Sequence, residues 1–272
     1  MTRRSQHGEM QTLKFVCYYG MERFLLAAPS FTLDRSGTPY RRLSATLLVA
    51  CKEPFHLEVA DDCRYTGNVA LIAPDTPRHR TVAENSDILI FDVSIGSPEC
   101  TALRPILRDR QLVTFELAQL HAWLPTMQKA LDCTASAEEV RRLFSGVIGD
   151  IAGNAPGERH IDSRIEAALR LIHELPFNEV NLQVLASRLH LSPSRLRHLF
   201  KDEIGSTLSR YLRWVAVWRG VDLWAQGKPL TEIAHEAGFY DLAHLNRAYV
   251  ELFGINPSSA VHPRNVTVIR SL

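Results

Sequence analysis

The stretch LTEIAHEAGFYDLAHLNRAYVELFG, residues 230–254, contains the pattern that decides the fold of this protein. Its apolar residues recur at helical spacing up to Gly238, and a second amphipathic segment with His, Asn and Arg follows. An earlier part of the chain has the same pattern, because NLQVLA ending at Ala186 aligns with PLTEIA ending at Ala234 at an offset of 48 residues. A repeated helix, tight turn and helix is more informative than one copy and predicts a duplicated structural unit.

Each copy has the sequence features of a helix-turn-helix. In the first copy, Ser192 is suited to cap a helix and Pro193 to occupy its first position, where the missing N–H costs nothing. In the second copy, Gly238 permits the sharp turn and Phe239 is expected to fill it. The outward positions of the second helix in each copy are predicted to face a DNA major groove. They are Ser194, Arg195, Arg197, His198 and Lys201 in the first copy, and Leu242, Ala243, Asn246 and Arg247 in the second.

The positive charge of the chain is local. The formal net charge of the 272 residues is only +1, which argues against a strongly basic nucleic-acid binder. Residues 188–219, however, hold seven basic and two acidic side chains, a local net charge of +5 that suits DNA phosphates. One amphipathic hairpin with a surface arginine is more often plain packing, but the duplication, the caps and this charge together favour DNA recognition.

The first hundred residues favour strands. Short runs such as LKFVCYY, LSATLLVAC and ILIFDVSI are rich in β-branched and aromatic residues, and Pro, Gly, Asp and Asn separate them. Many short strands with turn signals predict a β-barrel or a sandwich. From Phe115 onward the apolar period becomes helical, and residues 136–152 predict a helix that begins with a Ser136 and Glu139 capping box. Its apolar stripe comprises Val140, Leu143, Phe144, Val147, Ile148 and Ile151.

The segment GNAPGERH, residues 153–160, is expected to be a linker because it combines two Gly and one Pro without apolar periodicity. It would join domains at 1–152 and 161–272, a division that the chain length permits.

No apolar run approaches the roughly 20 residues that span a bilayer, and the N-terminus lacks an export signal, so we expect a cytoplasmic protein without membrane contact. Five widely spaced cysteines without a Cys-x-x-Cys pair indicate reduced thiols rather than disulfides or a zinc site.

Two stretches resemble the AraC/XylS family of transcription regulators: LASRLHLSPSRLRHLFKDEIGSTLSRYL, residues 185–212, and IAHEAGFYDLAHLNRAYVELFGINPS, residues 233–258. The resemblance covers about residues 161–260 and implies seven helices with two helix-turn-helix units. It also implies binding of promoter DNA, usually as an activator, with RNA polymerase as a partner. The chain departs from the family at Tyr249 and Val250, where Phe-Lys is usual. The recognition positions that the resemblance implies are Ser194, Arg197, His198, Leu242, Ala243, Asn246 and Arg247.

In this family the N-terminal domain is commonly a cupin-like barrel that binds a small effector and is followed by helices that dimerise. The resemblance therefore implies an α+β protein, with an N-terminal cupin-like β-barrel and a helical pair followed by an all-α domain. The helix at 136–152 is then a candidate for a homodimer interface. Packing of its apolar stripe on its own barrel is the alternative and the commoner arrangement.

The stretch ALIAPDTPRHRTV, residues 70–82, resembles the turn of a cupin. Arg78, His79 and Arg80 in this stretch are candidates for binding an anionic effector, and a solvated run of charges is the alternative. A metal-binding cupin also needs a His-x-His and a Glu upstream, whereas FHLEV offers only His56 and Glu58. We therefore expect no metal, no cofactor and no enzymatic activity. The alternative function is a metal-dependent cupin enzyme with a helical appendage.

Overall fold

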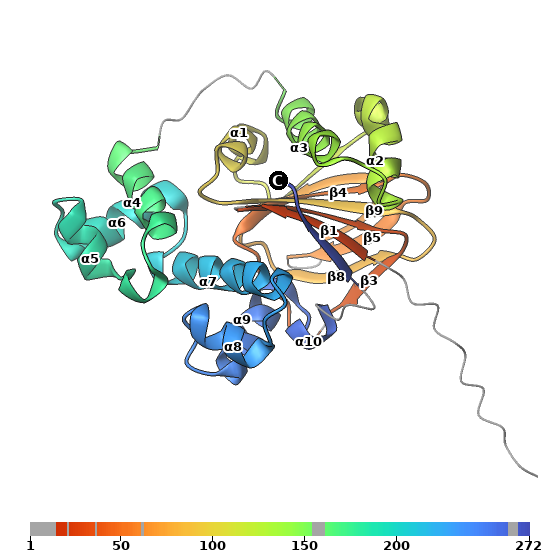
Figure 1. The fold of residues 1–272 in the computed structure, drawn as a ribbon. Helices are drawn as coiled ribbons and strands as arrows, with labels where there is room; N and C mark the ends of the chain where they lie inside the picture. The colour runs from red at the N-terminus through yellow and green to blue at the C-terminus, as the bar shows by residue number, and fades with distance from the viewer. Residues whose placement is uncertain (1–14, 21, 36, 61–62, 154–160, 261–265) are drawn as a thin grey trace, which may run out of the picture.

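The computed structural model of the protein describes residues 15–20, 22–35, 37–60, 63–153, 161–260 and 266–272. A strand-rich N-terminal region and a helical C-terminal region confirm the predicted α+β class (Figure 1). The linker expected at 153–160 lies outside the described residues except for Gly153, which ends helix α3 (Ala137–Ala152). Among the described helices, none combines the length and the apolar character that a membrane crossing requires. No disulfide joins the five cysteines, each of which is among the described residues.

The described strands form two sheets. The first sheet has seven strands in the order β10-β7-β4-β9-β2-β1-β11, and the second has four in the order β3-β8-β5-β6. Neighbouring strands are antiparallel except for β1 and β11, which are parallel. The bounds are β1 Phe15–Gly20, β2 Arg23–Ala28, β3 Phe31–Asp34, β4 Ser44–Ala50, β5 Phe55–Val59, β6 Cys63–Gly67, β7 Val69–Ile72, β8 Arg78–Ala83, β9 Ile88–Ser94, β10 Leu112–Phe115 and β11 Val266–Arg270.

The two sheets pack face to face around an apolar core. Strand β5 alternates buried Phe55 and Leu57 with outward His56 and Glu58, as expected for a strand with one face against a core. Buried residues of β4, β7 and β9 complete this core from the first sheet. The cupin-like β-barrel that the resemblance implies is therefore open, and the predicted alternative of a sandwich fits the two sheets. In the described residues the edge strands of one sheet do not pair with those of the other, so side-chain packing, not a continuous hydrogen-bond ladder, joins the sheets.

Helices cover the other face of the first sheet: α1 (Pro98–Leu107), the 3-10 helix η1 (Leu117–Trp123), α2 (Leu124–Leu131) and α3. Helix α3 begins with the predicted capping box, in which Ser136 Oγ accepts from Glu139 N at 3.2 Å and Glu139 Oε2 accepts from Ser136 N at 2.8 Å. All six residues of its apolar stripe are buried, and the Phe144 ring lies 5.8 Å from the Phe91 ring. The stripe thus packs on its own sheet.

Residues 161–260 form the seven α-helices that the family resemblance implies, together with one short 3-10 helix. The helices bury an apolar core that includes Leu185, Leu196, Phe200, Ile233 and Leu245. The bounds are α4 Ser163–Glu174, η2 Phe177–Glu179, α5 Leu182–Arg188, α6 Pro193–Ile204, α7 Leu208–Ala225, α8 Leu230–Glu236, α9 Leu242–Phe253 and α10 Pro257–Ala260.

The helical region is packed against the N-terminal sheet. Trp214 of α7 is buried, and its Nε1 donates to Ser94 Oγ of β9 at 2.7 Å. The rings of Trp218 and Phe253 lie 5.1 and 6.5 Å from the ring of Phe24. After the helices the chain returns to the sheet, where β11 pairs with β1 at its edge. Sequence patterns did not anticipate this strand.

Candidate nucleic-acid interface and buried arginine pair

The first helix-turn-helix consists of α5 and α6. Ser192 caps α6, since its Oγ accepts from Arg195 N at 3.2 Å, and Pro193 occupies the first turn as predicted. Leu196 and Phe200 are buried, which turns the intervening positions outward. The five residues predicted to face DNA are all exposed: Ser194, Arg195, Arg197, His198 and Lys201.

The second helix-turn-helix consists of α8 and α9. Gly238 has a φ of 85° in the turn, and an added Cβ there would overlap with the ring of Phe177. Its counterpart in the first unit, His190, also has a positive φ, 54°, so the two copies share one turn conformation. Asp241 caps α9 and accepts from His244 N at 2.6 Å. Of the predicted contact residues, Ala243 and Arg247 are exposed, and Leu242 and Asn246 are half-buried.

Sequence patterns missed Tyr240. It lies directly before the cap of α9, and 85% of its surface is exposed. A large aromatic side chain next to the N-terminus of a recognition helix is suited to contact DNA. The sequence did not indicate this exposure, because Tyr240 lies in a turn without helical or strand periodicity and follows the buried Phe239.

The connecting helix α7 has 18 residues, which corresponds to a length of about 27 Å. It joins the two units, and three of its arginines form contacts with other parts of the protein. Arg210 forms a bidentate ion pair with Asp75 of the N-terminal region, at 2.7 and 2.8 Å. Arg213 pairs with Glu251 at 2.9 Å, and Arg219 donates to backbone carbonyls of the α4–η2 segment. Four basic residues of the 188–219 stretch remain exposed on α5 and α6: Arg188, Arg195, Arg197 and Lys201.

The three candidates for effector binding lie on β8, and Arg78 separates from Arg80 because the register of β8 against β5 shifts there, with Glu58 paired to Arg80 and Val59 to Arg78. On β8, Arg78 is 2% exposed and points inward, whereas Arg80 is exposed and lies 3.3 Å from Asp34. His79 is half-buried. The weak metal candidates of β5 lie on the outer face, where His56 Nδ1 contacts Thr66 Oγ1 at 2.8 Å. No group of three or more His, Cys, Asp or Glu within the described part of the chain is arranged to hold a metal ion.

Arg78 belongs instead to a buried cluster with Arg42 and Asp92, which sequence patterns did not bring together. Arg42 Nη1 donates to Asp92 Oδ2 at 2.8 Å, and Thr46 Oγ1 donates to the same oxygen at 2.9 Å. Arg78 Nη2 donates to Thr46 Oγ1 at 2.7 Å. Arg42 and Asp92 are 6% and 1% exposed, so the cluster holds two buried guanidinium groups and one carboxylate, which Arg42 contacts directly and to which Thr46 connects Arg78.

The cluster carries more buried positive than negative charge, because it holds two guanidinium groups and one carboxylate. Burial and the charge of Arg42 lower the pKa of Arg78 to about 10. Burial is also the largest influence on Arg42 and acts to lower its pKa, but the charge and hydrogen bond of Asp92, together with Tyr40 and Tyr249, outweigh it, and the pKa of Arg42 is raised. The Nε atoms of both arginines are buried without a hydrogen-bond partner in the structure. A buried polar group in this state costs free energy that a suitable acceptor would recover.

Arg42 also lines a cavity of about 240 Å³ between the sheet and the helices. The sheet contributes Phe15, Cys17 and Leu26, and the helices contribute Trp224 and Tyr249, so both regions form its walls. Arg42 is the only charged residue among those described in the lining. An elongated apolar ligand with one anionic group would match this distribution.

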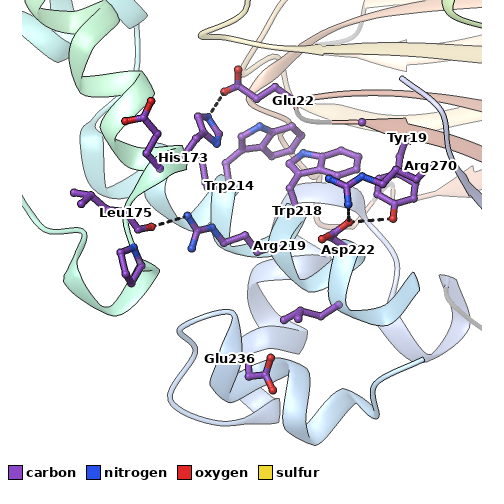
Figure 2. Close-up of a pocket in the computed structure, with 15 residues that line it drawn as sticks. Tyr19, Glu22, His173, Leu175, Trp214, Trp218, Arg219, Asp222, Glu236 and Arg270 are labelled. Atoms are coloured by element: carbon purple, nitrogen blue, oxygen red, sulfur yellow. Dashed lines mark hydrogen bonds and ion pairs between the residues drawn. The ribbon is translucent and has the colours of Figure 1, made fainter. Parts of the chain in front are cut away.

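A second, more polar pocket of about 500 Å³ lies where α4, α7 and the end of β1 meet (Figure 2). Glu22 accepts from Tyr211 Oη and lies 3.1 Å from His173 Nε2. Nearby, Asp222 Oδ1 accepts from Tyr19 Oη at 3.1 Å and lies 3.4 Å from Arg270 Nη1. These contacts connect the helical region to the sheet, and they do not include the predicted DNA-facing residues.

Comparison with known sequences identifies the helical region. Residues 185–261 match the family described as "Helix-turn-helix domain". The HTH-type transcriptional activator RhaR of Cronobacter sakazakii (strain ATCC BAA-894) is 30% identical over 106 residues. That match covers 39% of this chain and 36% of RhaR, so it spans little more than a third of that relative.

Comparison with solved structures concerns the whole fold. ToxT from Vibrio cholerae O395 is similar with a TM-score of 0.55 and 12% sequence identity, over 87% of this chain and 96% of ToxT. A structure of wild-type ToxT from Vibrio cholerae strain SCE256 with an unsaturated fatty acid bound gives a TM-score of 0.56 and 12% identity, over 87% and 94% of the two chains. At 12% sequence identity, the similarity to these structures establishes the fold of this chain.

Proposed function

We propose that this chain is a transcription regulator of the AraC/XylS type, which binds promoter DNA through its two helix-turn-helix units and activates transcription in response to a small molecule. The observation that carries the proposal is the pair of recognition helices α6 and α9, which present exposed residues from either side of one connecting helix. Successive major grooves on one face of B-DNA lie roughly 34 Å apart, a distance that two units joined in this way can bridge.

The predicted contact residues divide into two roles. Arg197 and Arg247 are suited to bidentate contacts with guanine, and Asn246 is suited to adenine. The other exposed basic residues of the first unit, Arg188 and Lys201, are suited to phosphates, which position the protein without specifying sequence.

Selection of binding sites from random double-stranded DNA with the whole chain tests this function. We expect enrichment of a site with two conserved elements about one helical turn apart, and affinity that falls steeply with salt. A shuffled version of the selected site serves as the control. Equal affinity for both DNAs, or no enrichment at all, would refute sequence-specific binding.

The effector that we propose is an apolar carboxylate. A buried charge without a partner is costly, and the Arg42 and Arg78 pair has one carboxylate for two guanidinium groups. A ligand carboxylate at Arg42 would supply the missing negative charge, while the apolar cavity would bury its hydrocarbon chain. The unsaturated fatty acid bound to the similarly folded ToxT supports this class of ligand.

Arg42→Met is therefore expected to weaken binding of palmitoleate at least about tenfold, since hydrogen bonds to charged groups contribute roughly 1.5–3 kcal/mol. Palmitoleyl alcohol, which lacks the charge, should bind the unmodified protein weakly. Arg80→Met is the matched control, because Arg80 lies exposed on the outer face and should not affect binding. Calorimetry with the delipidated protein measures all four affinities. Equal binding of the acid and the alcohol would exclude the carboxylate site.

We further propose that the protein works in the cytoplasm, contacts RNA polymerase and self-associates on DNA. Because the apolar stripe of α3 is buried, a homodimer through this helix would use its exposed face, where Glu138, Arg141 and Arg142 lie. Light scattering with and without the selected DNA measures the mass. A monomer under both conditions would exclude the dimer.

A further inference from the structure

Strand β11 follows the DNA-binding helices in sequence but lies on the N-terminal sheet. It pairs with β1 over five residues, from Phe15 with Val266 to Tyr19 with Arg270. The N–H groups of Ser271 and Leu272 then donate to the Tyr19 carbonyl at 3.0 and 3.1 Å. Parallel pairing is slightly weaker per residue than antiparallel pairing, and β11 has a partner on one edge only. The strand is thus a connection of modest stability between the two regions.

Contacts around β11 also hold the connecting helix. Arg270 of β11 and Tyr19 of β1 both contact Asp222, which lies near the end of α7 (Figure 2). Near the start of α7, Arg210 is bound by Asp75. The helix that joins the two DNA-binding units is therefore fixed to the loop between β7 and β8 near its start and to the sheet near its end.

This docked arrangement disfavours DNA binding in two ways. The charge of Arg210 is neutralised by Asp75 instead of attracting phosphate, and loss of a phosphate contact lowers affinity. Attachment of α7 and α9 to the sheet also restricts adjustment of the two recognition helices to the grooves. Release of the helical region would remove both restrictions.

We propose that β11 is an autoinhibitory strap, which holds the helical region in the docked arrangement until a ligand enters the cavity. Val266 and Val268 of β11 line the same cavity as Arg42, so a bound ligand touches the strap directly. A ligand that displaces these valines would loosen β11 and weaken its hold on α7. The effect on DNA binding rests on the proposed function, whereas the attachment of α7 to the sheet by β11 does not.

Gly20→Ala tests the strap with a single methyl group. An added Cβ at Gly20 would overlap with the backbone carbonyl of Leu272, so the end of the strap must move away. The matched control is Gly149→Ala on α3, where an added Cβ meets nothing within 4 Å. We expect Gly20→Ala and deletion of residues 266–272 to tighten binding to the selected DNA about fivefold or more without ligand, a typical size for coupling between sites. Gly149→Ala should bind as the unmodified protein does.

Val268→Cys tests the effect of fixing β11 to β1 instead of releasing it. Cys17 is the register partner of Val268, and adjacent strands lie about 4.8 Å apart, within the range of Cα separations that a disulfide bridges. Oxidation by diamide removes two protons and two electrons from the two thiols and forms the bond. We expect the oxidised variant to bind DNA more weakly than its reduced form, with recovery after dithiothreitol. The unmodified protein, oxidised in the same way, controls for its own cysteines.

Hydrogen exchange without DNA separates the strap from the proposed function. Gly20→Ala should increase exchange at the amides of Ser271 and Leu272 and along α7, whereas Gly149→Ala should not. Unchanged exchange in α7 would overturn the strap, and so would DNA affinities that stay equal or fall when β11 is released. Failure of the unmodified protein and every variant to select any DNA would instead refute the proposed function.

Discussion

Replacing Asp92 by asparagine is expected to lower the free energy of unfolding by about 3–5 kcal/mol, the usual loss when one partner of a buried ion pair is removed. Asn has nearly the same shape, so packing is preserved while the negative charge is lost. Arg42 and Arg78 would then be buried without the carboxylate that now accepts from Arg42 and from Thr46. Urea denaturation followed by tryptophan fluorescence measures the change.

The double variant Arg42→Met with Asp92→Asn provides the control for this effect. It removes one of the two guanidinium groups, so we expect it to recover part of the stability that Asp92→Asn loses. The free-energy change of the double variant, minus the sum of the changes in the Arg42→Met and Asp92→Asn single variants, gives the coupling energy between the two side chains. A loss below about 1 kcal/mol for Asp92→Asn would show that the cluster is not an unbalanced buried charge, because such small losses are typical of exposed pairs. The proposed anionic effector would then lose its physical basis.

Arg197→Ala and Arg247→Ala are expected to change which DNA sequence is bound. Each good bidentate contact with a base contributes about 1–3 kcal/mol of discrimination, so each variant should lose roughly 5- to 150-fold in affinity for the selected site. The two arginines lie on α6 and α9, so the sequence preference should relax at two separate positions about one helical turn apart. Site selection with each variant measures the preference, and fluorescence anisotropy measures the affinity.

Arg64→Ala is the matched control for both substitutions. Arg64 is exposed on β6 in the N-terminal region, away from the two recognition helices, and lies 3.4 Å from Glu58 on the neighbouring strand β5. This variant should recover the original consensus at the original affinity. If Arg197→Ala and Arg247→Ala do the same, then α6 and α9 do not contact bases in the proposed way. Melting temperatures near that of the unmodified protein would confirm that the exposed substitutions leave the fold intact.

The helix-turn-helix units could be predicted from the sequence because their signals are local. The caps of α6 and α3 depend on residues three positions apart, and the turn at Gly238 depends on one backbone angle. The buried cluster could not be predicted in this way. Arg78 was singled out only with its neighbours His79 and Arg80, but a register shift in β8 lets Arg78 point inward, where it donates to Thr46 of β4.

The sequence by itself determined which region forms strands and which forms helices, how α3 and α6 begin, and which residues of α6 face outward. These properties depend on periodicity, caps and turns, which act over a few residues. The tertiary structure alone decided that the strands form two open sheets, that the stripe of α3 packs on its own sheet, and that β11 returns to β1. It also decided that Arg42, Arg78 and Asp92 share one buried site. Such pairings join residues far apart in the chain, and their free energy depends on the packing and hydrogen-bonding alternatives available in the whole fold.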